Sequence, residues 1–124
     1  MKKKRAIGME FAGTMILALA VVGSGHMAAN LSQDGGIRLL INALATAVGL
    51  AVVIKIGMKT SGAHFNPVVT LVMVILKKIS NEVAALYIAA QVLGAVLGVG
   101  IANLIYDQDF LKQSSILRDG SNLL

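Results

Sequence analysis

The sequence has no cysteine, only 14% charged residues and a single proline among 124 residues. Without cysteine there is no disulfide framework, no thiolate nucleophile and no Cys-ligated metal site. The two histidines, His26 and His64, have no carboxylate cluster near them, so we expect no metal site. No Ser-His-Asp order, carboxylate pair or glycine-rich phosphate loop is present. We therefore expect neither a cofactor nor an enzyme activity.

Charge is also unevenly distributed along the chain. Hydrophobic residues make up 56% of the sequence, which is too much for a soluble domain of this size. Four stretches are almost free of charge: roughly 6–29, 36–54, 67–76 and 83–106. Three of them approach or exceed the ~20 residues that a helix needs to cross a bilayer, whereas the fourth is about half that length. The sequence thus predicts an all-α membrane protein with three transmembrane helices and one re-entrant half-helix.

The basic residues set the expected topology. We expect spans at about 6–29, 37–58 and 81–106, a re-entrant loop and half-helix at about 59–76, and a polar tail at 107–124. Eight basic residues then lie on one side of the membrane and three on the other. The positive-inside rule makes the first side, with the amino terminus, cytoplasmic, and we expect a multi-pass protein of the cell membrane.

Two other interpretations of the basic residues are less favourable. A basic start followed by an apolar run also resembles a secretory signal peptide. Here the run exceeds 20 residues, Glu10 interrupts its beginning and further spans follow, so a retained first span is favoured. Nucleic-acid binding is not expected, because the basic residues lie at the ends of apolar segments and form no stripe with aromatic residues.

The short apolar stretch begins with Asn66 and Pro67. Proline is favoured at the first helical position, and asparagine before it can cap the free N–H groups. A half-helix that begins near the membrane midplane directs the positive end of its dipole at the bilayer centre. The alternative is an amphipathic helix on the membrane surface, but residues 71–76 offer no polar face.

Three segments resemble one known family. Residues 61–70 (SGAHFNPVVT) closely resemble the first pore-loop motif of the aquaporin and aquaglyceroporin, or major intrinsic protein, family. Residues 10–14 (EFAGT) resemble the signature of its first helix, and residues 87–95 (YIAAQVLGA) resemble its third helix. Their order and spacing also fit. The resemblance covers the amino-terminal half of the family's fold, to about residue 106.

The resemblance implies a passive channel for water and small neutral solutes such as glycerol or neutral metalloid hydroxides. In the pore motif Asn66-Pro67-Val68, the asparagine would donate hydrogen bonds to the solute. Carbonyl groups near Gly62, Ala63 and His64 would line the approach. Val68 departs from the alanine that usually follows Asn-Pro, which would narrow the pore slightly or shift its packing.

Three residues outside the motif complete the expected site. Glu10 would anchor the re-entrant loop by accepting hydrogen bonds from its backbone N–H groups. Gln91 is expected to make a structural contact with the same loop. Thr46 falls where the second helix contributes to the family's selectivity filter. A small residue at this position, which is aromatic in strict water channels, favours a wider and more polar filter.

The family builds its pore from two inverted repeats, and this chain contains only the first. We therefore expect a complementary second half, on the same longer chain or a separate one, and a tetramer is possible. Residues 114–121 resemble the connector between repeats. The alternatives are a non-conducting membrane protein or assembly subunit, an antiparallel homodimer and a broken-helix transporter. The excess of basic residues on one side disfavours the homodimer, because a protein that inserts in both orientations needs a weak charge bias. The lack of buried ionisable residues beyond Glu10 disfavours the transporter.

Several further residues have mainly structural interpretations. Four small residues at every fourth position favour close helix packing: Ala90, Gly94, Gly98 and Ala102. Asn42 recurs on one face of its span with Thr46 and Gly49, and either a pore wall or a contact between helices explains it. His26 is expected to be an interfacial residue, and Ser24 a helix-packing one.

Overall fold

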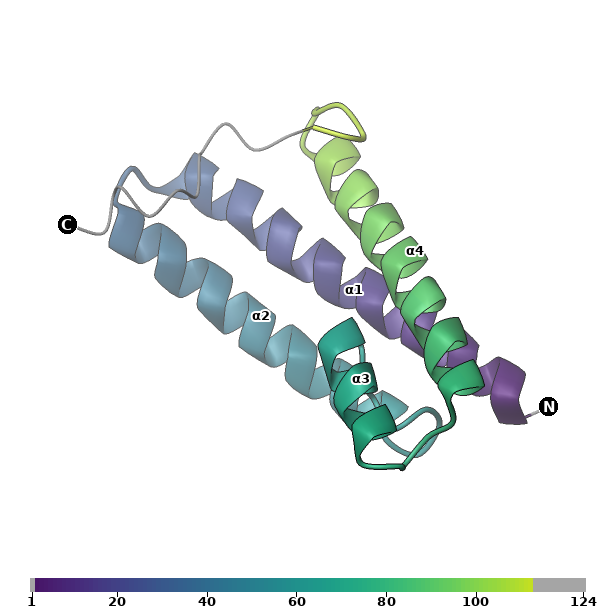
Figure 1. Cartoon of the computed structure of the whole chain (residues 1–124). Coiled ribbons are helices and arrows are strands. Elements are labelled where there is room, and N and C mark those ends of the chain that lie inside the picture. The colour runs from purple at the N-terminus through teal and green to yellow at the C-terminus, as the bar shows by residue number, and fades with distance from the viewer. Residues whose placement is uncertain (1, 113–124) are drawn as a thin grey trace.

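The protein is a bundle of helices. The computed structural model describes residues 2–112, which form helices and turns without a strand. The helices are α1 (Lys2–Leu31), α2 (Gly35–Gly57), α3 (Pro67–Ile75) and α4 (Asn81–Ile105). Helix α1 contacts both α2 and α4, while α3 rests against α4 (Figure 1). This confirms the predicted all-α fold. The connector-like residues 114–121 lie outside the described part.

Helix length separates α3 from the rest. Helices α1, α2 and α4 have 30, 23 and 25 residues, and each is long and apolar enough to cross a membrane. Helix α3 has nine residues, which at 1.5 Å per residue is about 14 Å, or half the hydrocarbon thickness. Helix α1 starts at Lys2 rather than near residue 6, because lysine and arginine are good helix formers and continue the first span outward.

Capping side chains define where the later helices begin. Asp34, Asn66 and Ser80 accept hydrogen bonds from the backbone N–H groups of the first turns of α2, α3 and α4, respectively. In the turn between α1 and α2, the Arg38 guanidinium donates a hydrogen bond to the carbonyl oxygen of Ser32 at 2.6 Å. This bond satisfies an acceptor where α1 ends, and it holds α1 and α2 antiparallel.

Small residues bring α1 and α4 unusually close. A Cβ atom added to Gly94 would overlap the carbonyl oxygen of Phe11, and one added to Gly98 would overlap the carbonyl oxygen of Met15. The α4 backbone therefore lies directly on the α1 backbone. All four residues of the small-residue stripe are buried. The expected packing role of this stripe is confirmed, and its physical basis is the absence of a side chain at the crossing.

The other faces of the bundle remain apolar and exposed. Only Val53 and Gly57 of α2 are buried, whereas its large apolar residues point outward. Val68, Leu71 and Ile75 of α3 are 65%, 52% and 76% exposed. Such surfaces suit the hydrocarbon of a bilayer or further protein, since lipid tails are as apolar as these side chains.

Candidate functional site

The loop between α2 and α3 has an unusual backbone. Gly62, Ala63 and Phe65 have φ angles of 91°, 54° and 48°, in the left-handed region. Only glycine adopts this region without strain, and a non-glycine residue there costs of order 1–3 kcal/mol unless its surroundings compensate. Asn66 then returns to an extended conformation with φ −154°. The loop keeps this shape because side chains from two helices hold it.

Glu10 of α1 is the centre of that support. Its side chain is fully buried, at 0% exposure. Oε1 accepts from the Ser61 hydroxyl at 2.5 Å and the backbone N–H of His64 at 3.0 Å. Oε2 accepts from the backbone N–H of Phe65 at 2.7 Å and the Gln91 amide at 2.8 Å. Four donors match the roughly four acceptor positions of a carboxylate, so a costly buried acid is fully satisfied.

A second set of hydrogen bonds joins the loop to α3 and α4. Gln91 Nε2 donates to Thr70 Oγ1 at 3.0 Å as well as to Glu10. The Thr70 hydroxyl donates to the carbonyl of Asn66 at 3.1 Å and lies 3.0 Å from His64 Nδ1. Because the hydroxyl has only one proton, the network assigns the ring proton of His64 to Nδ1. One continuous network thus joins Glu10, Gln91, Thr70 and His64.

An aromatic ring also fixes the loop. Phe65 is 4% exposed, and its ring lies against both Gly13 of α1 and Gly57 of α2. A Cβ on Gly13 would come within 2.6 Å of the Phe65 Cδ1 atom, and one on Gly57 within 2.5 Å of Cζ. Tyr87 adds a hydroxyl bond to the Ser61 carbonyl at 2.9 Å. No role for Phe65, Gly13, Gly57 or Tyr87 in holding the loop was predicted from the sequence, although Phe65 lies inside the motif.

Asn66 and Pro67 form the start of α3. The Asn66 Oδ1 atom accepts from the backbone N–H of Val68 at 2.8 Å, and Pro67 occupies the first turn. Asn66 is exposed, and among residues 2–112 its Nδ2 group has no protein acceptor. Two donors are therefore presented beside the positive end of the α3 dipole. Gly62 is exposed and Ala63 half-buried, while His64 is only 8% exposed.

Thr46 lies apart from this network. It belongs to α2, and in the described part of the chain the backbones of α2 and α3 do not pack closely against each other. The Thr46 Oγ1 atom is buried and has no hydrogen-bond partner within residues 2–112. Its neighbour Asn42 donates to the Val21 carbonyl at 2.7 Å and to Ser24 Oγ at 3.0 Å. Of the two explanations for Asn42, the contact between helices is therefore confirmed.

His26 makes specific contacts at the opposite end of the bundle. Its Nε2 atom lies 3.0 Å from Asn103 Oδ1, and its ring stacks on Tyr106 with centroids 5.2 Å apart. The Asn103 amide donates in turn to the Phe110 carbonyl at 3.1 Å. Within the described residues, no group of three His, Cys, Asp or Glu side chains could hold a metal ion.

The sequence profile of the major intrinsic protein family matches residues 1–123. The chain belongs to this family. Among curated relatives, it is similar to the aquaglyceroporin AqpS of Rhizobium meliloti (strain 1021), with 41% identity over 111 residues. That alignment covers 90% of this chain and 48% of AqpS. The family assignment agrees with the buried glutamate and the capped half-helix found in the structure.

Two further relatives of this major intrinsic protein are more distant. The probable aquaporin TIP3-2 of Oryza sativa subsp. japonica is 39% identical over 102 residues, covering 81% of this chain and 38% of that protein. Aquaporin-4 of Mus musculus is 34% identical over 101 residues, covering 82% and 31%. The chain therefore spans half or less of the length of these curated relatives.

Proposed function

We propose that this chain forms the first half of a passive membrane channel for water and small neutral solutes. The observation that carries this proposal is the half-helix α3. It begins at Pro67, directly after the exposed N-cap residue Asn66. The loop before it is held by hydrogen bonds from its backbone N–H groups to the buried Glu10 carboxylate. Irregular backbone at membrane depth is tolerated only where it is buried in protein or lines a water-filled path.

The chemistry of the loop fits neutral solutes that both donate and accept hydrogen bonds. The Asn66 Nδ2 group would donate to the solute oxygen, and the carbonyl groups of Gly62, Ala63 and His64 would accept from its hydroxyl groups. The positive end of α3 would disfavour protons and other cations in the path. Solutes would move down their own gradient without coupling to an ion, and we expect no catalysis.

Thr46 supports a preference for solutes larger than water. We propose that it contributes a small, polar and partly exposed side chain to the selectivity filter. Glycerol and neutral metalloid hydroxides carry several hydroxyl groups and would fit such a filter. The similarity to a relative named as an aquaglyceroporin points in the same direction.

The pore would be completed by a complementary half, on the same longer chain or on a separate one. The exposed apolar surfaces of α2 and α3 offer room for it, and a tetramer of complete channels is the assembly that we expect. By the positive-inside rule, the end with eight basic residues would be cytoplasmic in the cell membrane.

The first test combines intact mass with flux. The protein would be isolated from its own membranes with a tag near Met1, weighed and reconstituted into vesicles. We expect rapid, non-saturable swelling in water and glycerol gradients from the polypeptide or complex that contains this chain. Purified protein that shows neither water flux nor glycerol flux would support the alternative, a non-conducting membrane protein or assembly subunit.

A further inference from the structure

The peptide group between Ser61 and Gly62 is held differently from the rest of the pore loop. The three backbone N–H groups that follow Gly62 all donate to side chains, one to the Ser61 hydroxyl and two to the Glu10 carboxylate. The N–H of Gly62 itself has no acceptor among residues 2–112. The Glu10 network therefore fixes the later part of the loop and leaves the orientation of this first peptide group to another contact.

That contact is the hydroxyl of Tyr87 in α4. Tyr87 is 4% exposed, and its hydroxyl donates to the Ser61 carbonyl oxygen at 2.9 Å. Within the described part of the chain, this carbonyl accepts no other hydrogen bond. The Tyr87 ring stands edge-on to the His64 ring, with centroids 5.3 Å apart, so the hydroxyl has a fixed place beside the loop. One hydrogen bond thus holds the Ser61–Gly62 peptide group.

The direction of the Ser61 carbonyl also sets the direction of the Gly62 N–H. The peptide bond is trans, so its C=O and N–H point in opposite directions. Because the carbonyl is directed at the buried Tyr87, the N–H is directed toward the exposed side of the loop, and Gly62 is itself exposed. The next three carbonyl groups, those of residues 62–64, accept no hydrogen bond within the described chain. A free donor therefore precedes three free acceptors.

The backbone at Gly62 permits this peptide group to turn over. Gly62 has a φ angle of 91°, and glycine adopts negative φ values about as readily as positive ones. A half-turn would bring the Ser61 carbonyl to the exposed side and direct the N–H into the protein. Without the Tyr87 hydroxyl, the Ser61 carbonyl would be a buried acceptor without a partner, which favours the turned-over form.

We propose that Tyr87 is a positioning residue of the channel, whose hydroxyl keeps the Gly62 N–H facing the solute. Its effect on flux rests on the proposed function, whereas its effect on the peptide group does not. A solute hydroxyl group would accept from the Gly62 N–H and donate to the carbonyl groups that follow. A turned-over peptide would instead present four successive carbonyl oxygens, an arrangement that favours cations. Tyr87 itself is buried and does not touch the solute.

The first test follows the Gly62 amide proton by NMR. In the full polypeptide or complex, carbonyl-¹³C serine combined with ¹⁵N glycine gives signals only from Ser–Gly pairs, which in this chain are Ser24-Gly25 and Ser61-Gly62. We expect the Gly62 proton to exchange rapidly with water in the parent protein. In Tyr87→Phe its exchange should slow by about twofold or more, because the turned-over N–H is directed into the protein. A merely loosened loop would speed this exchange instead.

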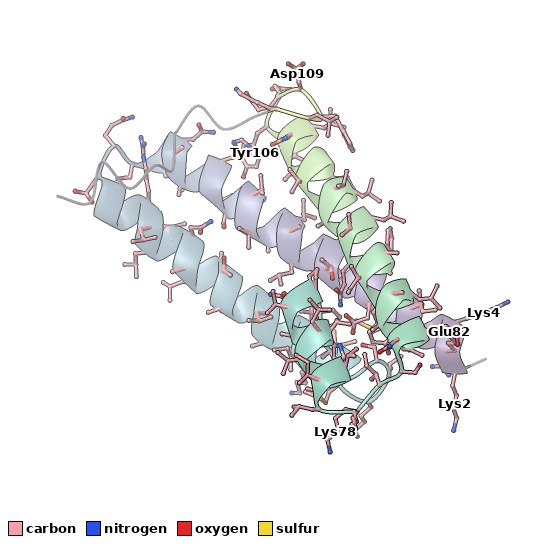
Figure 2. All side chains as sticks on the ribbon, viewed as in Figure 1. Lys2, Lys4, Lys78, Glu82, Tyr106 and Asp109 are labelled. Atoms are coloured by element: carbon pink, nitrogen blue, oxygen red, sulfur yellow. The ribbon has the colours of Figure 1, made fainter. Side chains whose placement is uncertain are left out.

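The second tyrosine of the chain gives a matched control. Figure 2 shows Tyr106 at the end of the bundle opposite Lys78, and its hydroxyl makes no hydrogen bond in the described part of the chain. Tyr106→Phe should leave Gly62 exchange at the rate of the parent protein. The Gly25 proton, inside α1, should exchange slowly in every sample. Ser61→Thr keeps the hydroxyl and assigns the Gly62 signal by its loss.

Flux connects this orientation with transport. In vesicles with equal amounts of folded protein, Tyr87→Phe should decrease water and glycerol flux about threefold, the order of effect of one lost hydrogen bond, and Tyr106→Phe should decrease neither. Slow Gly62 exchange in the parent, unchanged or faster exchange in Tyr87→Phe, or parental flux in that variant would each overturn the proposal. A parent without flux, combined with slowed Gly62 exchange in Tyr87→Phe, would refute the proposed function and still support Tyr87 as the residue that orients the peptide group.

Discussion

Glu10 Oε2 accepts a hydrogen bond from the backbone N–H of Phe65 at 2.7 Å, across 55 positions of the sequence. The same carboxylate accepts from the N–H of His64. These two bonds hold adjacent amide groups in a loop where Ala63 and Phe65 have left-handed φ angles. A side chain on α1 therefore stabilises a backbone shape that the loop residues would not adopt alone.

Replacing Glu10 should unfold the loop. In Glu10→Gln, the side-chain nitrogen becomes a donor that faces other donors, so we expect at least one of the backbone bonds to be lost. The free energy of unfolding should fall by about 3 kcal/mol, and flux should fall with it. Thermal unfolding of the purified protein measures the change. The control is Glu82→Gln, whose exposed ion pair with Lys3 should matter little. Equal melting temperatures for both variants would contradict this account.

Asn66 has two roles that one substitution can separate. Asn66→Asp keeps an oxygen that caps Val68 but loses the Nδ2 donors, so α3 should remain folded while glycerol and water flux decrease. Its negative charge should also weaken the exclusion of cations by the α3 dipole. Stopped-flow vesicle assays with a pH-sensitive dye would measure both effects. Asn66→Ala removes the cap as well, and it should cost about 1 kcal/mol in stability. Unchanged flux in the aspartate variant would exclude Asn66 from the solute path.

The crossing of α1 and α4 should not tolerate a side chain. Gly94→Ala would place a methyl group on the Phe11 carbonyl, and we expect a loss of about 1–3 kcal/mol as the helices separate. Gly23→Ala is a matched control in α1, since a Cβ there meets no atom within 4 Å. That substitution should leave stability unchanged or raise it slightly through helix propensity. The half-life in harsh detergent should therefore be shorter than that of the parent protein for Gly94→Ala, and equal or slightly longer for Gly23→Ala.

A substitution at Thr46 tests whether the proposed filter passes solutes larger than water. Thr46→Phe should decrease glycerol flux more than water flux in any complete channel that contains this chain, because the larger ring would narrow the proposed filter. Val48→Phe, two residues away on an exposed face of α2, controls for bulk alone and should affect neither flux. The two permeabilities come from vesicle swelling and shrinkage rates. Equal reductions for both solutes would refute the wide-filter interpretation.

The sequence identified the fold because charge is scarce in a membrane protein. Long uncharged stretches predicted α1, α2 and α4, and the Asn66-Pro67 pair predicted the start of α3, since capping is a local property. Glu10 was predicted to have a functional role because it is an isolated acid in an apolar segment. Its partners on the loop and on Gln91 were expected from the family resemblance rather than from spacing.

Contacts between distant residues were harder to predict. The Phe65 ring packs between Gly13 of α1 and Gly57 of α2. No local sequence pattern indicates that these two glycines lie close together. The Asn42 bond to a backbone carbonyl of α1 could not be distinguished from a pore-wall position, because a polar residue on an apolar helix fits both. Helix α1 extends from Lys2 beyond the expected span at about 6–29, since span estimates count apolar residues and stop at the first charges.

The bonds at Glu10 and at the Val21 carbonyl make α1 a spacer of fixed length. Eleven positions separate these residues, or about 16 Å of helix. One inserted residue between them would rotate one attachment by about 100° relative to the other, so that either the loop or Asn42 would lose its partner. Changes in chain length should therefore be tolerated before Glu10 or in the turn at 32–34, and rejected between these two attachments.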